Sequence, residues 1–269
     1  MNQLSKRTAI AVLACLASCG KQDGKTRDIA CLPSSLSTNV IAFYPFSSGS
    51  LLDRSGNNRH LVGVGAVGPD ADRDNNPQCA YVLNNTGGNT AYLTCPDPTF
   101  LNNLSGLSVS AWYTITDSLR YGGSYTTLVS RDTAKACPDR GGQWSLGLYD
   151  CSRAVFGMYH SVWDQMITSP VSCEKEMRLR YHSWHHAVAT YDKATMSIAI
   201  YRDGVLQETR TGVADCGSGA PLVRDIGDLM LGYRFTGKLD DVALFDKALT
   251  QQEVSALYNS APCCSTYVE

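Results

Sequence analysis

The sequence carries almost no excess charge of either sign. It has 23 Lys and Arg residues against 25 Asp and Glu residues in a chain of 269, a formal net charge of −2. It shows no basic stripe or arginine cluster of the kind that follows a phosphate backbone. Nucleic acid is therefore not an expected partner, and an acidic membrane surface should not attract the chain strongly.

Sequence motifs for two common chemistries are also missing. There is no Gly-x-Ser-x-Gly turn that would place a nucleophilic serine, and no Cys-x-x-Cys pair of the kind that holds structural zinc. Apolar residues seldom recur with helical periodicity, whereas short alternating runs are frequent. The sequence also contains 14 tyrosines and 23 glycines. With 43% hydrophobic residues, the composition predicts one sizeable all-β domain.

The longest apolar run lies at the N-terminus. Lys6 and Arg7 precede an apolar stretch over about residues 9–17, which is too short to span a bilayer as a mature helix. This order predicts an export signal over residues 1–18. Leu-Ala-Ser directly before Cys19 resembles the bacterial lipobox, whose cysteine receives a diacylglycerol. We expect an exported lipoprotein of the outer membrane or cell surface, held only by its lipid. The alternative is an ordinary signal peptide with a stray cysteine.

Cysteine usage agrees with export. Loss of Cys15 with the signal and lipidation of Cys19 leave nine cysteines, which in a secreted chain indicate disulfides. These candidates are Cys31, Cys79, Cys95, Cys137, Cys151, Cys173, Cys216, Cys263 and Cys264. Spacing suggests two local bridges, Cys79–Cys95 and Cys137–Cys151. Two longer ones would join Cys173 to Cys216 and Cys31 to one of the C-terminal pair. Nine is odd, so at least one thiol is left over.

Residues 38–260 are predicted to form one folded domain, between a flexible tether over 19–37 and a Cys-containing tail over 261–269. Two antiparallel sheets packed face to face, a jelly-roll-type sandwich, are expected from the spacing of the strand-like runs. The tight Asp203-Gly204 step predicts a hairpin. Thr250 and Glu253 have capping-box spacing and predict one short C-terminal helix. The predicted strands are 39–46, 60–64, 79–84, 91–95, 107–115, 126–131, 143–149, 154–160, 184–192, 196–204, 205–210, 228–234 and 238–245.

Four segments in order resemble the concanavalin A-like, laminin G-like jelly roll in its bacterial form. They are AFYPFSSGSLLDRSGNNRHL (42–61), LSVSAWYTI (107–115), WHHAVATYDKATMSIAIYRDGVLQ (184–207) and FTGKLDDVALFDKALTQQEVSALY (235–258). The resemblance extends over nearly all of residues 40–258. It implies two sheets, a core built around Trp112 and Trp184, and a helix after the last strand.

The same resemblance implies a structural calcium ion on the convex side. Proteins of this fold often hold one between the last strand and the loop after the first strand. The matching groups are Asp240, Asp53 and the backbone around Gly56 and Asn57, all hard oxygen donors of the kind that calcium prefers. In the metal-free alternative, Asp240 accepts hydrogen bonds from the 53–58 turn. Strand alternation would turn Asp241 the other way, toward solvent or toward Lys238 or Arg234.

Catalysis is not expected. Glycoside hydrolases of related folds carry Glu-x-Asp-x-x-Glu on one strand face, and this motif is absent. The acidic run over residues 70–74 reads as a solvated loop or a weak second cation site. His182, His185 and His186 could be drawn as a zinc cluster, but His185 and His186 would face opposite ways on a strand, which favours a structural role.

Binding is the remaining function. Glycan sites combine aromatic platforms with planar polar groups, and the stretch GMYHSVWDQM (157–166) mixes both. The candidate ligand-binding residues are Trp163, Tyr159, Tyr149 and Tyr233, with Trp163 preferred because it lies outside the core-forming motifs; the alternative for each is packing within a sheet. The sequence thus predicts a non-catalytic module for a glycan or glycoprotein. A protein-binding adhesion module is second, and a hydrolase or lyase with an unrecognised site is third.

Overall fold

The structure, a computed structural model, describes residues 31–88, 90–96, 98–102, 104–116, 125–131, 144–149, 153–158, 183–211 and 227–266. The strands are β1 (Val40–Tyr44), β2 (Val62–Val64), β3 (Val67–Asp70), β4 (Ala80–Leu83), β5 (Tyr92–Cys95), β6 (Gly106–Ile115), β7 (Thr126–Arg131), β8 (Trp144–Tyr149), β9 (Arg153–Met158), β10 (His185–Asp192), β11 (Ser197–Arg202), β12 (Val205–Thr211), β13 (Leu229–Leu231) and β14 (Gly237–Phe245). Helix α2 spans Gln251–Tyr258, and short 3₁₀ turns lie at Ser34–Leu36, Ser47–Gly49, Thr86–Gly88, Thr99–Leu101 and Cys263–Thr266.

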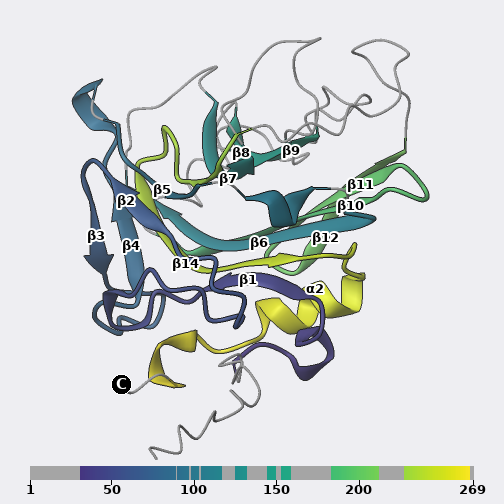
Figure 1. Cartoon of the computed structure of the whole chain (residues 1–269), viewed down its shortest axis with the longest axis horizontal. Coiled ribbons are helices and arrows are strands. Elements are labelled where there is room, and N and C mark those ends of the chain that lie inside the picture. The colour runs from purple at the N-terminus through teal and green to yellow at the C-terminus, as the bar shows by residue number, and fades with distance from the viewer. Residues whose placement is uncertain are drawn as a thin grey trace, which may run out of the picture.

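The strands form two antiparallel sheets that stack on each other, as the sequence predicted. Sheet A has eight strands in the order β12-β11-β10-β6-β14-β4-β3, with β1 also pairing with β14. Sheet B has six strands in the order β2-β5-β13-β7-β8-β9. Helix α2 lies on the side of sheet A that faces away from β7, β8 and β9 of sheet B (Figure 1). Each sheet therefore has an inner face toward the other sheet and an outer face.

The inner faces make the main hydrophobic core. Along β6, alternate residues such as Val109 and Tyr113 join this core, and sheet B contributes Trp144 and Phe156. The expected centre of the core was wrong: Trp112 lies on the outer face of sheet A, and Trp184 is only half-buried. Side chains alternate along β6, so Trp112 points to the opposite face from Val109 and Tyr113. Trp184 lies just before β10.

A second apolar cluster covers the outer face of sheet A. Leu36 and Val40 from the start of the described chain meet Val254 and Leu257 of α2 there, and all four are buried. The capping box of α2 forms as predicted: the Thr250 side chain accepts from the Glu253 amide, and the Glu253 side chain accepts from the Thr250 amide. Residues 31–37, expected in the tether, thus belong to the packed body.

Local predictions agree with most strands but miss one. The Asp203–Gly204 step does turn a hairpin between β11 and β12, and both residues have positive φ, 50° and 77°. Strand β3 was missed because Gly68 and Pro69 break its pattern. Among the described strands it pairs with β4 alone, at the edge of sheet A. No helix in the described part of the chain has the length and apolar character needed to cross a membrane.

Candidate functional site

Four half-buried tyrosines gather on the outer face of sheet B. Tyr92 precedes the core residue Leu93 on β5, and Tyr149 follows the core residue Leu148 on β8, so both side chains point outward. The Tyr233 ring lies edge-on to the Tyr92 ring, with 5.8 Å between centroids.

The fourth ring, of Tyr125, crosses the same face above Gly147. A Cβ at Gly147 would lie 2.2 Å from the Thr126 carbonyl oxygen and 2.9 Å from the Tyr125 hydroxyl, so glycine leaves room for both the backbone and this ring. Gly147 lies between the core residues Leu146 and Leu148, so its missing side chain would point outward.

Sheet register brings these tyrosines into a short row. The Tyr233 carbonyl accepts a 2.9 Å hydrogen bond from the Thr127 amide, and Thr127 pairs with Gly147. The row therefore crosses four neighbouring strands, β5, β13, β7 and β8. Three interstrand spacings of ~4.8 Å give the row a width of about 14 Å. Arg234 is exposed with its guanidinium carbon 5.4 Å from the Tyr233 ring centroid, and Arg153 is half-buried opposite Tyr149. We call the four tyrosines and two arginines the tyrosine face.

The predicted binding residues divide into two groups. Tyr149 and Tyr233 both lie on the tyrosine face. Trp163 and Tyr159 lie outside the described residues, as does the predicted lipidation site Cys19.

The predicted calcium ligands of the first loop are occupied by hydrogen-bond donors. Asp53 is buried, and its Oδ1 accepts from the amides of Phe43 and Ser55 at 3.0 and 2.9 Å. Its Oδ2 accepts from the Ser55 hydroxyl at 2.9 Å and the Arg59 amide at 3.0 Å. Two bonds at each oxygen use the lone pairs that a metal would need.

The neighbouring predicted ligands hold the same turn together. Gly56 provides a positive φ of 81°, and the Asn57 side-chain amide donates to the Ile41 carbonyl at 3.1 Å. These side chains therefore hold the turn closed and fasten it to β1.

Asp240 has a different partner. A β-bulge between Asp240 and Ala243 shifts the register of β14 against β6, and Asp241 takes a φ of 44°. Both aspartates consequently lie on the outer face of sheet A, where Arg73 Nη1 contacts Asp240 Oδ2 at 2.6 Å and Asp241 Oδ2 at 2.8 Å. The expectation that Asp241 turns to the opposite face was wrong because the bulge breaks the alternation. Lys238 pairs instead with Asp70, at 3.1 Å.

The acidic run around Arg73 lies in a surface loop, as predicted, with Asp74 and Asn75 exposed, but Asp72 is turned inward. Asp72 is 2% exposed, and its Oδ1 accepts from the amides of Asp74 and Asn76, each at 2.9 Å. Asn76 also donates its side-chain amide to Asp72 Oδ2 at 2.9 Å. These bonds fold the loop so that Arg73 points under the C-terminal segment, where its Nη2 donates to the Ser260 carbonyl at 3.3 Å.

The predicted sets Asp53–Gly56–Asn57 and Asp240 thus serve two separate hydrogen-bond networks. Their geometry does not fit a shared calcium ion, because donors fill Asp53 and a guanidinium already neutralises Asp240. Calcium binding by the chain stays a prediction, to be decided by experiment.

Comparison with known proteins now supplies the family. The profile of the "Laminin_G_3: Concanavalin A-like lectin/glucanases superfamily" matches residues 86–255. The chain belongs to this superfamily. No curated protein matches the sequence of this concanavalin A-like chain.

Solved structures share its fold at low sequence identity. The binding domain of botulinum neurotoxin DC, in complex with rat synaptotagmin II, aligns with a TM-score of 0.61 and 18% identity over 83% of this chain and 52% of that one. A second structure comes from botulinum neurotoxin type C, whose cell entry is dependent upon interaction with two ganglioside molecules. It aligns with a TM-score of 0.61 and 16% identity over 84% of this chain and 52% of that one. This concanavalin A-like chain spans about half the length of these neurotoxin structures.

A third structure matches over nearly its whole length. Domain 4 of AbnA, an extracellular arabinanase from Geobacillus stearothermophilus in complex with arabinotriose, gives a TM-score of 0.54 and 19% identity over 82% of this chain and 98% of that one. Such identities show a common fold and leave the ligand of the present chain to its own site.

The histidines of this superfamily member hold structure. His185 Nδ1 contacts Asp203 Oδ2 at 2.9 Å, at the β11–β12 turn. His186 is buried on the outer face, with Nε2 2.8 Å from the Ser110 hydroxyl and its ring stacked on Trp112. The two rings do face opposite ways, as expected; His182 lies outside the described residues.

Two disulfides join distant parts of the concanavalin A-like domain. Cys31 bonds to Cys263, as expected for one of the C-terminal pair, and Cys79 bonds to Cys264, with Cα–Cα distances of 5.4 Å in both. The predicted Cys79–Cys95 bridge was wrong: Cys79 lies beside the C-terminal segment at the start of β4, whereas Cys95 faces the main core from β5. The remaining candidates, Cys137, Cys151, Cys173 and Cys216, lie outside the described residues.

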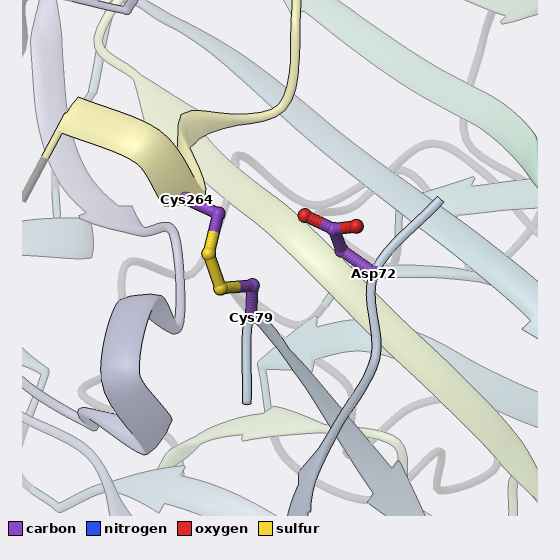
Figure 2. A group of neighbouring side chains, drawn as sticks. All are labelled: Asp72, Cys79 and Cys264. Atoms are coloured by element: carbon purple, nitrogen blue, oxygen red, sulfur yellow. A yellow bond between two sulfur atoms is a disulfide. The ribbon is translucent and has the colours of Figure 1, made fainter. Parts of the chain in front are cut away.

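Asp72 lies beside the Cys79–Cys264 bridge (Figure 2). Its carboxylate and the two sulfurs lie within 4.8 Å of one another. The sulfurs are bonded to each other and Asp72 holds its own loop, so these three residues do not make a metal site.

Sequence reasoning missed Tyr92 and Tyr125 on the tyrosine face, and Arg73 entirely. Tyr92 could have been found from the sequence, because strand alternation turns the neighbour of the apolar Leu93 toward the surface. Tyr125 and Arg73 come from loops, and their contacts over Gly147 and at the aspartate pair depend on tertiary structure.

Proposed function

We propose that this chain is a non-catalytic binding module that recognises a glycan through the tyrosine face. The observation that carries the proposal is the placement of four partly accessible tyrosine rings on one outer sheet face. Aromatic faces offer flat apolar area to sugar rings, while their hydroxyls can bond sugar hydroxyls.

Two further features support a glycan ligand. Arg234 and Arg153 flank the rings with planar donors, which can bond hydroxyl oxygens in fixed directions. The structural neighbours named above include one captured with arabinotriose and one described as depending on gangliosides. A glycan or the glycan part of a glycoprotein is therefore the ligand class that we propose.

A glycan array with a soluble form (residues 20–269) tests this proposal. We expect saturable binding that weakens at least tenfold (about 1.4 kcal/mol) in Tyr233→Ala, as for a truncated aromatic anchor. Tyr233→Phe keeps the ring and should retain most of the affinity. Leu206→Ala, an exposed residue on β12 of the other sheet, is the matched control and should bind like the parent. Binding that is unaffected by Tyr233→Ala would remove the tyrosine face from the proposal.

The edge of sheet A favours a second candidate function. Val205 and Leu206 on the edge strand β12 are 60% and 43% exposed, an apolar feature suited to strand addition by a protein partner. A blank array combined with capture of a protein ligand that Leu206→Ala abolishes would favour this alternative.

We also propose export and lipid anchoring at Cys19, which the order of charge, apolar run and Leu-Ala-Ser-Cys supports. Replacing Cys19 by Ala should move the protein from the membrane fraction to the soluble fraction, because the acyl chains are its only anchor. Fractionation with an antibody against the folded domain measures this. Unchanged membrane association of Cys19→Ala would contradict the proposed anchor.

A further inference from the structure

The aspartate pair of β14 requires a cation. Asp240 and Asp241 are 1% and 9% exposed, and the bulge holds both carboxylates on the same face. Burial raises the pKa of each, and the charge of Asp241 raises that of Asp240 further. Two adjacent carboxylates out of water are costly unless a positive group lies between them.

Arg73 supplies that positive group in a fixed position. One nitrogen, Nη1, contacts both carboxylates at 2.6 and 2.8 Å, while Nη2 donates to the Ser260 carbonyl. The guanidinium carbon lies 4.3 Å from the Trp112 ring centroid, and the side chain is 8% exposed. The guanidinium is thus bound by two anions, a carbonyl and an aromatic face.

The loop of Arg73 is built to present it. Three hydrogen bonds to the Asp72 carboxylate shape the turn, and the Cys79–Cys264 bridge fastens the end of the loop to the C-terminal segment. The same segment closes over the pair, since the Cys263 amide donates to Asp241 Oδ2 at 3.3 Å. The cation is therefore pre-positioned by covalent and polar contacts on both sides.

The oxygens around this guanidinium are of the kind that bind calcium. Asp240 and Asp241 offer carboxylates and Ser260 a carbonyl; Asp241 Oδ1 accepts no hydrogen bond from the described residues. Arg73, Asp241 and Ser260 also line a pocket with Trp112 and His186, which provides space beside the pair. Without the guanidinium, these oxygens would surround unoccupied space.

We propose that Arg73 is a built-in substitute for a structural metal ion: it closes the Asp240–Asp241 site to divalent cations in the native chain, and its removal opens a calcium site there. The inference stands independently of glycan binding, because the tyrosine face is on the other sheet.

Thermal unfolding of the soluble form in calcium chloride and in EDTA tests the proposal. We expect any calcium response of the native chain to be unchanged by Asp240→Asn, because Arg73 closes this site. Arg73→Ala should melt lower in EDTA and recover by about 5 °C or more in millimolar calcium, because an ion that binds only the folded state stabilises it. The double variant Arg73→Ala, Asp240→Asn should lose that recovery.

The quantity to compare is the rise in melting temperature from EDTA to calcium, taken for the variant minus that for the native chain. If calcium raises the melting temperature of the native chain and Asp240→Asn abolishes that rise, the proposal is overturned, because the metal would then bind beside Arg73. Arg73→Gln, which keeps a side-chain donor, replaces the alanine variant if that one does not fold. A folded Arg73 variant with no added calcium response would equally overturn it.

Discussion

At the scale of the residue, His186 shows what burial does to a titrating group. Its ring is 1% exposed beside the stacked rings of Trp112 and Tyr258. Burial lowers its pKa to about 3, with Asp203 raising and Arg73 lowering it. The folded protein therefore holds this imidazole neutral where the unfolded chain, near 6.5, would protonate it. Such a group opposes folding in acid.

His186 should destabilise the domain as pH falls from about 6.5 toward 3, by up to about 5 kcal/mol, because only the unfolded state takes up the proton there. Asp241 acts oppositely: its pKa is raised to about 6, so the stability that its protonated form contributes is present below about 4 and lost as pH rises through 6. Urea unfolding of His186→Gln between pH 4 and 7 should show a smaller loss in acid than the parent. A variant with the parental acid loss would contradict this assignment.

At the scale of the element, alternation predicted the sheets well and failed where the backbone leaves regular geometry. Strand β6 and helix α2 follow from apolar periodicity and from the Thr250–Glu253 box. The bulge at Asp240–Asp241 has no comparable signal. Nothing in the sequence LDDV (239–242) indicates that β14 has one more residue than β6 at this point of their pairing. The aspartate partner was therefore sought in the 53–58 turn and is found in the loop before β4.

The same limit applies to the tyrosine face. Tyr149 and Tyr233 could be selected from the sequence as aromatic residues in or beside strands. Whether each side chain points to the core or to the surface could be decided only once the neighbouring core residues were known. The Tyr125 ring packs over Gly147 of the neighbouring strand, and residues this far apart in the sequence share no local pattern.

At the scale of the whole molecule, the adjacent residues Cys263 and Cys264 fasten both the start of the described chain and β4 to one C-terminal turn. With Cys79–Cys264 intact, Cys31–Cys263 closes a loop of 48 residues (79 − 31). It therefore constrains chiefly residues 31–78, which include β1 and the Asp53 turn.

Replacing Cys31 and Cys263 together by Ser should lower the free energy of unfolding by about 2–4 kcal/mol, the range expected for closing a loop of this size. Urea unfolding measures the loss, and hydrogen exchange should rise first over residues 31–44. The paired Cys79→Ser, Cys264→Ser variant is the control and should loosen the Arg73 loop instead. Equal exchange patterns in the two variants would contradict this division.

The Cys31–Cys263 bridge also sets the side of the sandwich from which the N-terminal segment leaves the folded body. It fixes the beginning of the folded body on the α2 side of sheet A, and the tyrosine face lies on the opposite side of the sandwich (Figure 1). Immobilisation through the N-terminal segment, for example on a sensor chip, therefore attaches the domain from the side away from the tyrosine face. We expect ligands to reach that face on a surface prepared in this way.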